Sequence, residues 1–183
     1  DFLSKEAAEE EKEAYVDALI KEIKSYKKFA GNYKVSTVFV GGGTPSCLRA
    51  EQTKRIFDAL YEIFEFVKHP EITTEMNPGT VDREKLEVYK ACGINRLSIG
   101  MQSVKDENLK VLGRIHNFEQ LLEAYQLSRE AGFTNINLDL MSSLPSQTKE
   151  EWEEELQKTV ELNPEHISAY QLIIEEGTPF YEK

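Results

Sequence analysis

The sequence predicts an α/β protein built as a partial (β/α) barrel, and three observations lead to this fold class. Short segments rich in β-branched and aromatic residues alternate with amphipathic helical segments along the 183 residues. The helical segments supply the crossover connections that parallel strands require. Polar side chains follow every predicted strand. In a doubly wound sheet they would gather at the single point where the strand order reverses, so this pattern favours a barrel.

The first part of the chain predicts a helix followed by alternating strands and helices. A helix is expected from Lys5 to Lys28, because apolar side chains recur there every three or four residues. That apolar stripe comprises Tyr15, Leu19, Ile23 and Tyr26. The next elements are a strand at Ser36–Val40, a helix with Ile56, Leu60, Ile63 and Val67 on one face, and a strand at Glu71–Met76.

The second part continues the same alternation. Its elements are a helix at Asp82–Cys92, a strand at Arg96–Met101, a helical region at Val104–Ala131, a strand at Asn135–Met141, a helix at Lys149–Leu162 and a strand at His166–Ile174. Gly93 and Gly132 are expected to end two of the helices. Thr148 and Glu151 predict a capping box for a third. No linker or low-complexity segment divides the chain, so one domain over residues 1–183 is expected.

Composition excludes several classes of partner. The net charge of -11 and the pI of about 4.9 repel nucleic acid and anionic lipid surfaces. No apolar run approaches the roughly 20 residues of a transmembrane helix, so a cytoplasmic location is expected. Cys47 and Cys92 are too far apart for a close-spaced metal motif, and we expect both to be buried. The three histidines form no spaced pair, so no metal is assigned to them.

The chemistry of a parallel barrel lies at the carboxyl ends of its strands. The residues there are Gly41 to Pro45, Glu75 with Asn77, Gln102 with Ser103, Asp139, and Tyr170 to Ile174. The glycine triplet either lets the backbone approach a ligand or makes a tight turn. Glu75 and Asp139 stand among apolar neighbours, where a charge is paired or ligand-bound. The alternatives are a structural ion pair for Glu75 and a turn cap for Asp139.

The combination of groups at the rim predicts the kind of ligand. Arg114 could pair with a carboxylate through its planar guanidinium, although a lone arginine is more often a surface residue. The glycine triplet lacks the residues of a phosphate-binding loop. Two acids, an amide, an arginine and open backbone suit a zwitterionic amino-acid ligand that carries hydroxyl groups.

Several motifs in fixed order resemble one family. They are Phe39-Val-Gly-Gly-Gly-Thr-Pro-Ser46, Glu75-Met-Asn-Pro-Gly-Thr80, Arg96-Leu-Ser-Ile-Gly-Met-Gln-Ser103, Gly113-Arg-Ile-His116, Asn137-Leu-Asp-Leu-Met141, Asn163-Pro-Glu-His-Ile-Ser-Ala-Tyr-Gln-Leu172 and Glu176-Gly-Thr-Pro179. The sequence resembles the oxygen-independent coproporphyrinogen III oxidases among the radical SAM proteins, and more closely their haem-chaperone branch, the HemW type. The resemblance spans essentially the whole chain and implies a radical SAM core domain at residues 1–183.

The resemblance implies a binding site for S-adenosyl-L-methionine (SAM). Gly42, Gly43 and Thr44 would line its methionine end. Arg114 and Gln102 would hold polar atoms of the ligand, the arginine being suited to its carboxylate. Glu75 and Asp139 would take the ribose hydroxyls or the amino group, and Ile173 would lie against the adenine. In the family, a [4Fe–4S] cluster on three cysteines binds SAM and reduces it to a 5′-deoxyadenosyl radical.

The sequence departs from the family at the cluster motif. The pattern Cys-x-x-x-Cys-x-Tyr-Cys is absent, and Cys47 and Cys92 cannot replace three closely spaced ligands. In the family, an Asp-Phe like Asp1-Phe2 commonly follows the third cysteine. The chain is therefore expected to be cut immediately before Asp1, without the first strand and the cluster loop, and to be inactive by itself. The family's C-terminal domain, with the motif His-Asn-x-x-Tyr-Trp, is likewise absent.

Three functions follow from these features. The first is oxidative decarboxylation of coproporphyrinogen III, the reaction of the family's namesake. The second is a haem chaperone that keeps the SAM site and delivers haem to acceptor proteins, and the motif details favour it. The third is an unrelated barrel that binds another metabolite at the same rim.

Overall fold

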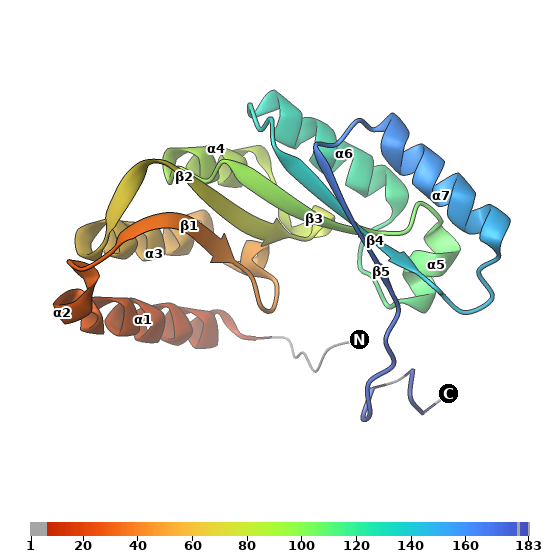
Figure 1. The fold of residues 1–183 in the computed structure, drawn as a ribbon. Coiled ribbons are helices and arrows are strands. Elements are labelled where there is room, and N and C mark those ends of the chain that lie inside the picture. Colours follow the sequence, from red (N-terminus) through yellow and green to blue (C-terminus); the bar gives the residue numbers. More distant parts are fainter. Residues whose placement is uncertain (1–6, 179, 183) are drawn as a thin grey trace.

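A computed structural model describes residues 7–178 and 180–182, and one parallel sheet forms its centre. The strands of the described residues lie in sequence order: β1 (Lys34–Val40), β2 (Glu65–Met76), β3 (Arg96–Gln102), β4 (Ile136–Ser142) and β5 (His166–Gln171). Every neighbouring pair is parallel. The predicted α/β class is confirmed, and Figure 1 shows the strands running side by side across the molecule.

Helices connect the strands. Those of the described residues are α1 (Glu9–Ser25), α2 (Lys27–Ala30), α3 (Ala50–Ile63), α4 (Arg83–Ala91), α5 (Asp106–Val111), α6 (Phe118–Glu130) and α7 (Lys149–Glu161). α3, α4, the pair α5 and α6, and α7 occupy the four crossovers between successive strands. Two short 3₁₀ turns, Pro45–Cys47 and Pro78–Thr80, follow β1 and β2 at the carboxyl end of the sheet.

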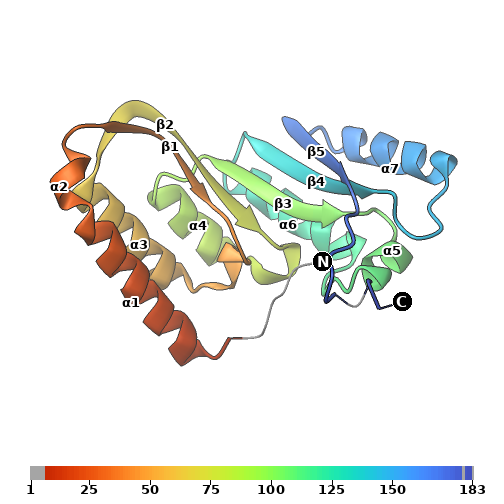
Figure 2. The ribbon, with the colours of Figure 1, turned by 60° about the horizontal axis from the view of Figure 1, so that its bottom comes forward.

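The helices cover one face of the sheet, and side-chain alternation sets what each face contains. In β3, Leu97 and Ile99 are fully buried and join the main apolar core, which also contains Leu86 of α4 and Leu121 of α6. The intervening positions point to the opposite side, which we call the open face. It carries Thr73, Glu75, Arg96, Ser98, Gln102, Asn137, Asp139, Ser168 and Tyr170. Figure 2 shows α3, α4 and α6 along one side of the strands.

The first helix differs from its predicted stripe by one position. Tyr15 is 62% exposed, whereas Val16 is fully buried. Val16 and Ile23 pack with Ile56 and Ala59 of α3 in a second, smaller core. Adjacent helical residues point about 100° apart, and the stripe that fits against α3 is the one without the large tyrosine ring.

Several boundary predictions were also wrong, including that of the last strand, which was expected at His166–Ile174 and ends at Gln171. Val67 lies in β2, because α3 ends at Ile63 and the strand already begins at Glu65. The predicted helical region Val104–Ala131 is two helices: Gly113 adopts a left-handed φ of 68° between them, and Asn117 caps the second. This break turns the Gly113–His116 segment toward the rim instead of along a helix.

Other local predictions can be checked against the described residues. Gly93 and Gly132 follow the ends of α4 and α6 with left-handed φ values, and Thr148 and Glu151 form a capping box, so these predictions are confirmed. Cys92 is buried as expected, but Cys47 is exposed on the turn after β1. Among the helices that the structure describes, none is long and apolar enough to cross a membrane.

Candidate functional site

The loop after β1 approaches β2 closely at Gly41. A Cβ atom at Gly41 would lie 2.6 Å from a ring carbon of Phe39 and 3.0 Å from the carboxyl carbon of Glu75, so a larger residue would push these side chains away. The backbone of Gly42, which has a left-handed φ of 113°, also lies close enough to the same carboxylate to lower its pKa. The glycines therefore bring backbone groups and a carboxylate together, as close approach requires.

A half-buried lysine ties this loop to the loop after β2. Lys85 of α4 donates from its Nζ to the backbone oxygens of Ser46, at 2.7 Å, and of Thr80, at 2.8 Å. The two hydroxyl groups of Ser46 and Thr80 lie 2.5 Å apart, and the Asn77 backbone N–H donates to Ser46 Oγ. Burial lowers the pKa of Lys85. Hydrogen bonds to uncharged carbonyl groups thus hold the two rim loops in fixed positions.

Two carboxyl groups on the open face, Glu75 and Asp139, are within electrostatic range of each other. Burial, and then repulsion from Asp139, raise the pKa of Glu75 above its usual value. Burial also raises the pKa of Asp139, and hydrogen bonds from Asn137 and Ser98 oppose that shift. Asn137 donates from Nδ2 to Asp139 at 2.7 Å, and Ser98 donates from Oγ at 3.2 Å.

These contacts decide between the alternatives for the two acids. Glu75 forms no ion pair with any residue that the structure describes, so the contacts there give no support to a structural ion pair. Asp139 accepts its hydrogen bonds from side chains within the sheet and caps no turn. Burial and mutual repulsion make it unfavourable for both acids to ionise in the free protein. Acids with raised pKa values of this kind occur in sites that bind cationic ligands.

Gln102 occupies a strained turn at the end of β3. Its φ is 68°, and the N–H of Ser103 donates to the carbonyl of Met101 at 2.9 Å across it. This is a γ-turn with positive φ, a conformation that costs energy and recurs at functional sites. Tyr170 of β5 donates from its hydroxyl to Gln102 Oε1 at 2.9 Å. The turn directs the Gln102 amide over the open face, where Gly100 leaves room for its Nε2 atom.

Arg114 is a half-buried cation without a direct partner. Its side chain forms no hydrogen bond or ion pair with any residue that the structure describes. Burial lowers the pKa of Arg114, and the charges of Tyr170 and Asp139 oppose this shift, so the guanidinium is within electrostatic range of these two groups. Arg114 therefore has donors available for an anionic group of a ligand. His116, two residues later, is buried, and its Nδ1 has no hydrogen-bond partner among the described residues.

The remaining predicted residues lie at the rim but are less constrained. Gly43 and Thr44 are exposed beside Gly42, and Ile173 is 61% exposed after the end of β5. The backbone N–H of Leu172 donates to Ser142 at the end of β4, which keeps Ile173 at this edge. The structure thus brings Gly42, Glu75, Gln102, Arg114 and Asp139 together, and leaves Gly43, Thr44 and Ile173 at the margin.

Sequence reasoning missed the residues that support this set. Ser98, Asn137 and Ser168 form a chain of hydrogen bonds across β3, β4 and β5, which ends on Asp139. A sequence signal existed, because Ser98 and Asn137 lie at even spacing from Gln102 and Asp139 in the same strands. Lys85 gave no comparable signal, because lysine is common on exposed helix faces.

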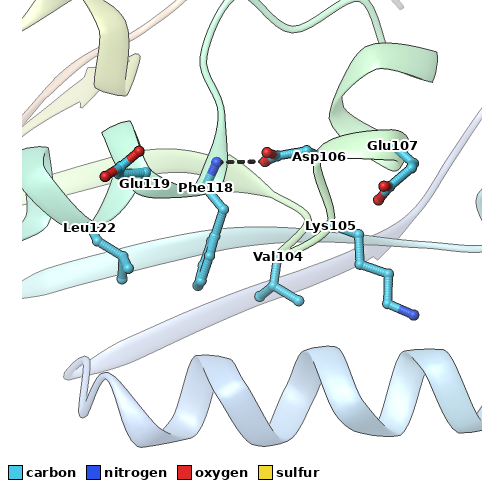
Figure 3. A pocket seen from close by; sticks show the side chains of 7 residues that line it. All are labelled: Val104, Lys105, Asp106, Glu107, Phe118, Glu119 and Leu122. Carbon is cyan, nitrogen blue, oxygen red and sulfur yellow. Dashed lines mark hydrogen bonds between the residues drawn. The ribbon is translucent and has the colours of Figure 1, made fainter.

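Neither a metal site nor a surface hollow coincides with these candidate residues in the described part of the chain. No group of three or more His, Cys, Asp and Glu side chains there could hold a metal ion, so these residues do not fit an iron–sulfur cluster. A surface hollow of about 550 Å³ lies by α5 and α6 and is lined by Val104, Lys105, Asp106, Glu107, Phe118, Glu119 and Leu122 (Figure 3). It lies apart from the open face, and its mixed charges identify no ligand.

Comparisons with known proteins agree with this geometry. Residues 4–159 match the family model of the Radical SAM superfamily. "Heme chaperone HemW" of Escherichia coli (strain K12) is 41% identical over 166 residues, which make up 91% of this chain and 44% of that protein. "Heme chaperone HemW" of Haemophilus influenzae is 42% identical over 159 residues, covering 87% and 42%. The chain thus spans less than half the length of these curated relatives.

Solved structures show the same fold. Coproporphyrinogen III oxidase (HemN) from Escherichia coli, a radical SAM enzyme, has a TM-score of 0.81 and 36% identity, covering 88% of this chain and 37% of that one. Elp3 from the archaeon Methanocaldococcus infernus, at 22% identity and a TM-score of 0.69, shows similarity of fold alone. The partial barrel and the resemblance to the coproporphyrinogen oxidase and HemW proteins are confirmed.

We predict that Lys85→Met destabilises the protein by about 1–3 kcal/mol, because the carbonyls of Ser46 and Thr80 lose their half-buried donor. Lys54→Met is the matched control, because its ammonium forms only an exposed pair with Asp58, which solvent screens. Urea unfolding of both variants measures the difference. Equal losses of stability would show that Lys85 does not tie the loops.

Proposed function

This chain belongs to the radical SAM superfamily, and on that premise we propose that it is the SAM-binding core of a haem chaperone. The observation that carries the SAM site is Arg114, a half-buried cation without a hydrogen-bonding partner in the described residues and within electrostatic range of Asp139. The names of the curated relatives support the haem chaperone. The chain would be one domain of a longer cytoplasmic protein that passes haem to acceptor proteins.

The charges of the site suit SAM. SAM carries a carboxylate, an ammonium and a sulfonium group, and so has one net positive charge. Glu75, Asp139 and Arg114 together carry one net negative charge when ionised. Because a partly buried site stabilises a ligand that neutralises it, this balance favours SAM over an anionic ligand such as a nucleotide.

Each protein group has a defined task in this proposal. Arg114 would bind the SAM carboxylate through its planar guanidinium. Glu75 and the backbone of Gly42, Gly43 and Thr44 would bind the methionine end, including its amino group. Asp139, held by Asn137 and Ser98, would accept hydrogen bonds from the ribose hydroxyls.

The remaining residues would fix the orientation of the ligand. Gln102 is oriented by Tyr170 and would hold a polar atom of SAM. Ile173, exposed at the edge of the site, would cover the adenine and exclude water from it. In this superfamily SAM supplies the reactive group, and the protein supplies position and electrostatics. The described residues do not fit a [4Fe–4S] cluster, so no step is assigned to one here.

The second candidate function is oxidation of coproporphyrinogen III. The structural similarity to coproporphyrinogen III oxidase favours it, because the two proteins share the strand arrangement that carries the site. Fold similarity is compatible with both functions, since related barrels host different chemistry at the same rim.

The two functions are separated by two assays of the full-length protein. We expect it to bind haem, seen as a titratable change in the haem absorbance spectrum, and to leave coproporphyrinogen III unconverted with SAM and reductant present. A known coproporphyrinogen III oxidase run in parallel shows that the assay conditions support turnover. Formation of protoporphyrinogen by this protein would replace the chaperone with the oxidase.

We predict that Arg114→Ala weakens SAM binding by about tenfold or more, because the carboxylate loses a charge-assisted hydrogen-bonding partner. Isothermal titration calorimetry of the full-length protein measures the effect. Trp152→Phe is the control, because Trp152 packs on the outer core, away from the open face. Equal affinities for wild type and Arg114→Ala would remove Arg114 from the site.

We predict that SAM affinity rises with pH through the range in which Glu75 and Asp139 ionise, which lies above the usual range of carboxyl groups. The pKa values of Glu75 and Asp139 are raised in the free protein, so a cationic ligand binds better once both groups are ionised, and binding releases protons. Burial lowers the pKa of His116 and raises that of Tyr170, so each shift favours the neutral form of its group and neither group accounts for the expected rise. Calorimetry in buffers of different ionisation enthalpy counts the protons that binding releases.

The variant Asp139→Asn should weaken SAM binding and flatten the pH profile of the affinity. An unchanged profile in this variant contradicts the assignment of Asp139.

A further inference from the structure

Helix α7 lies on the covered face of the sheet and carries a fully buried carboxyl group, Glu155. Its Oε1 atom accepts hydrogen bonds from Ser103 Oγ, at 2.6 Å, and from Asn108 Nδ2, at 3.0 Å. Ser103 follows β3, and Asn108 belongs to α5. Glu155 therefore joins α7 to the segment that leaves the candidate site, although the three residues are distant in sequence.

This carboxyl group is costly to bury. Burial raises the pKa of Glu155, and the hydrogen bonds from Ser103 and Asn108 oppose the shift. Its Oε2 atom and Gln147 Nε2 are buried and make no hydrogen bond of normal geometry among the described residues, although the Gln147 amide and the charge of Lys105 also oppose the shift. An apolar side chain at this position would pack without such costs. A partly satisfied buried acid in a core helix needs a reason other than packing.

The strained turn next to Ser103 provides that reason. Gln102 has a φ of 68°, and the turn is closed by the N–H of Ser103 donating to Met101. Strained backbone persists only where its surroundings hold it in place. Ser103 Oγ donates to Glu155 and accepts from the backbone N–H of Lys105, at 3.1 Å, so its side chain is fixed from both sides.

The same segment has a second attachment to α7, which is exposed. Lys105 pairs with Glu151 at 3.0 Å and with Glu154 at 3.4 Å. Figure 3 shows the Lys105 side chain pointing toward the helix below it. Exposed pairs of this kind contribute little because solvent screens them. The buried contact between Glu155 and Ser103 is therefore the stronger constraint on the turn.

We propose that Glu155 is a positioning residue for the SAM site: through Ser103 it holds the turn that orients the Gln102 amide. This inference rests on the function proposed above. Glu155 touches no ligand; it acts across the sheet, from the helical layer to the open face. The Gln102 amide is then held at its side chain by Tyr170 and at its backbone by the Ser103 turn.

The test measures SAM affinity in the full-length protein with its cluster reconstituted. Glu155→Ala is expected to weaken SAM binding about tenfold. Glu155→Gln is expected to stay within about threefold of wild type, because its amide oxygen still accepts from Ser103. Ser103→Ala should match Glu155→Ala, and the double variant should be no weaker than either single one, because both break the same contact.

A matched control separates positioning from general destabilisation. Thr159→Val alters a fully buried hydroxyl one turn along α7, which donates to the Glu155 carbonyl and does not contact Ser103. It should lower the melting temperature and leave SAM affinity unchanged. Where Glu155→Ala does not fold, Ser103→Ala breaks the same contact from the other side.

The outcomes distinguish the two proposals. Absence of SAM binding by the wild-type protein overturns the proposed function and this inference with it. SAM binding by the wild type with equal affinity in Ser103→Ala or Glu155→Ala overturns the positioning role alone. Losses that add in the double variant, or an equal loss in Thr159→Val, also overturn it.

Discussion

The alternation of side chains along a parallel sheet that is covered on one face is the constraint on which the rest of this structure depends. Leu97 and Ile99 of β3 enter the core because helices pack against them, and Ser98 between them must therefore point to the open face. The same rule applies to Asp139, between Leu138 and Leu140. Polar groups from successive strands thus gather on one surface while the core stays apolar.

The two acids on the open face suit a cationic ligand, but they lower the stability of the free protein. The pKa values of Glu75 and Asp139 are raised in the folded state, so each contributes most to stability below its unfolded-state pKa. This contribution is lost as the pH rises through the folded-state pKa. Once ionised, the two acids destabilise the free protein, and a cationic ligand would relieve their repulsion. Such a trade between stability and function is common at sites that must bind charge.

Two polar contacts hold the site from outside its ligand-facing surface. Half-buried Lys85 joins the loops after β1 and β2, and fully buried Glu155 joins α7 to the turn after β3. Both place a charged group behind a rim loop and bind it to uncharged partners. Loops at strand ends are mobile by default, because few buried contacts restrain them. These contacts give the rim the rigidity that an oriented ligand requires.

The sequence by itself determined the order of strands and helices, the α/β class and the residues at the strand ends, because hydrophobic periodicity and glycine placement are local properties of the chain. It also indicated Glu75, Gln102, Arg114 and Asp139 as site residues. It wrongly placed Tyr15 in the buried stripe of the first helix and Val67 in a helix. Only packing decides which of two adjacent residues is buried, or whether a residue at a boundary belongs to a helix or a strand. Tertiary structure alone revealed Lys85 and the contact between Glu155 and Ser103, since residues far apart in sequence meet only after the sheet and helices have packed together.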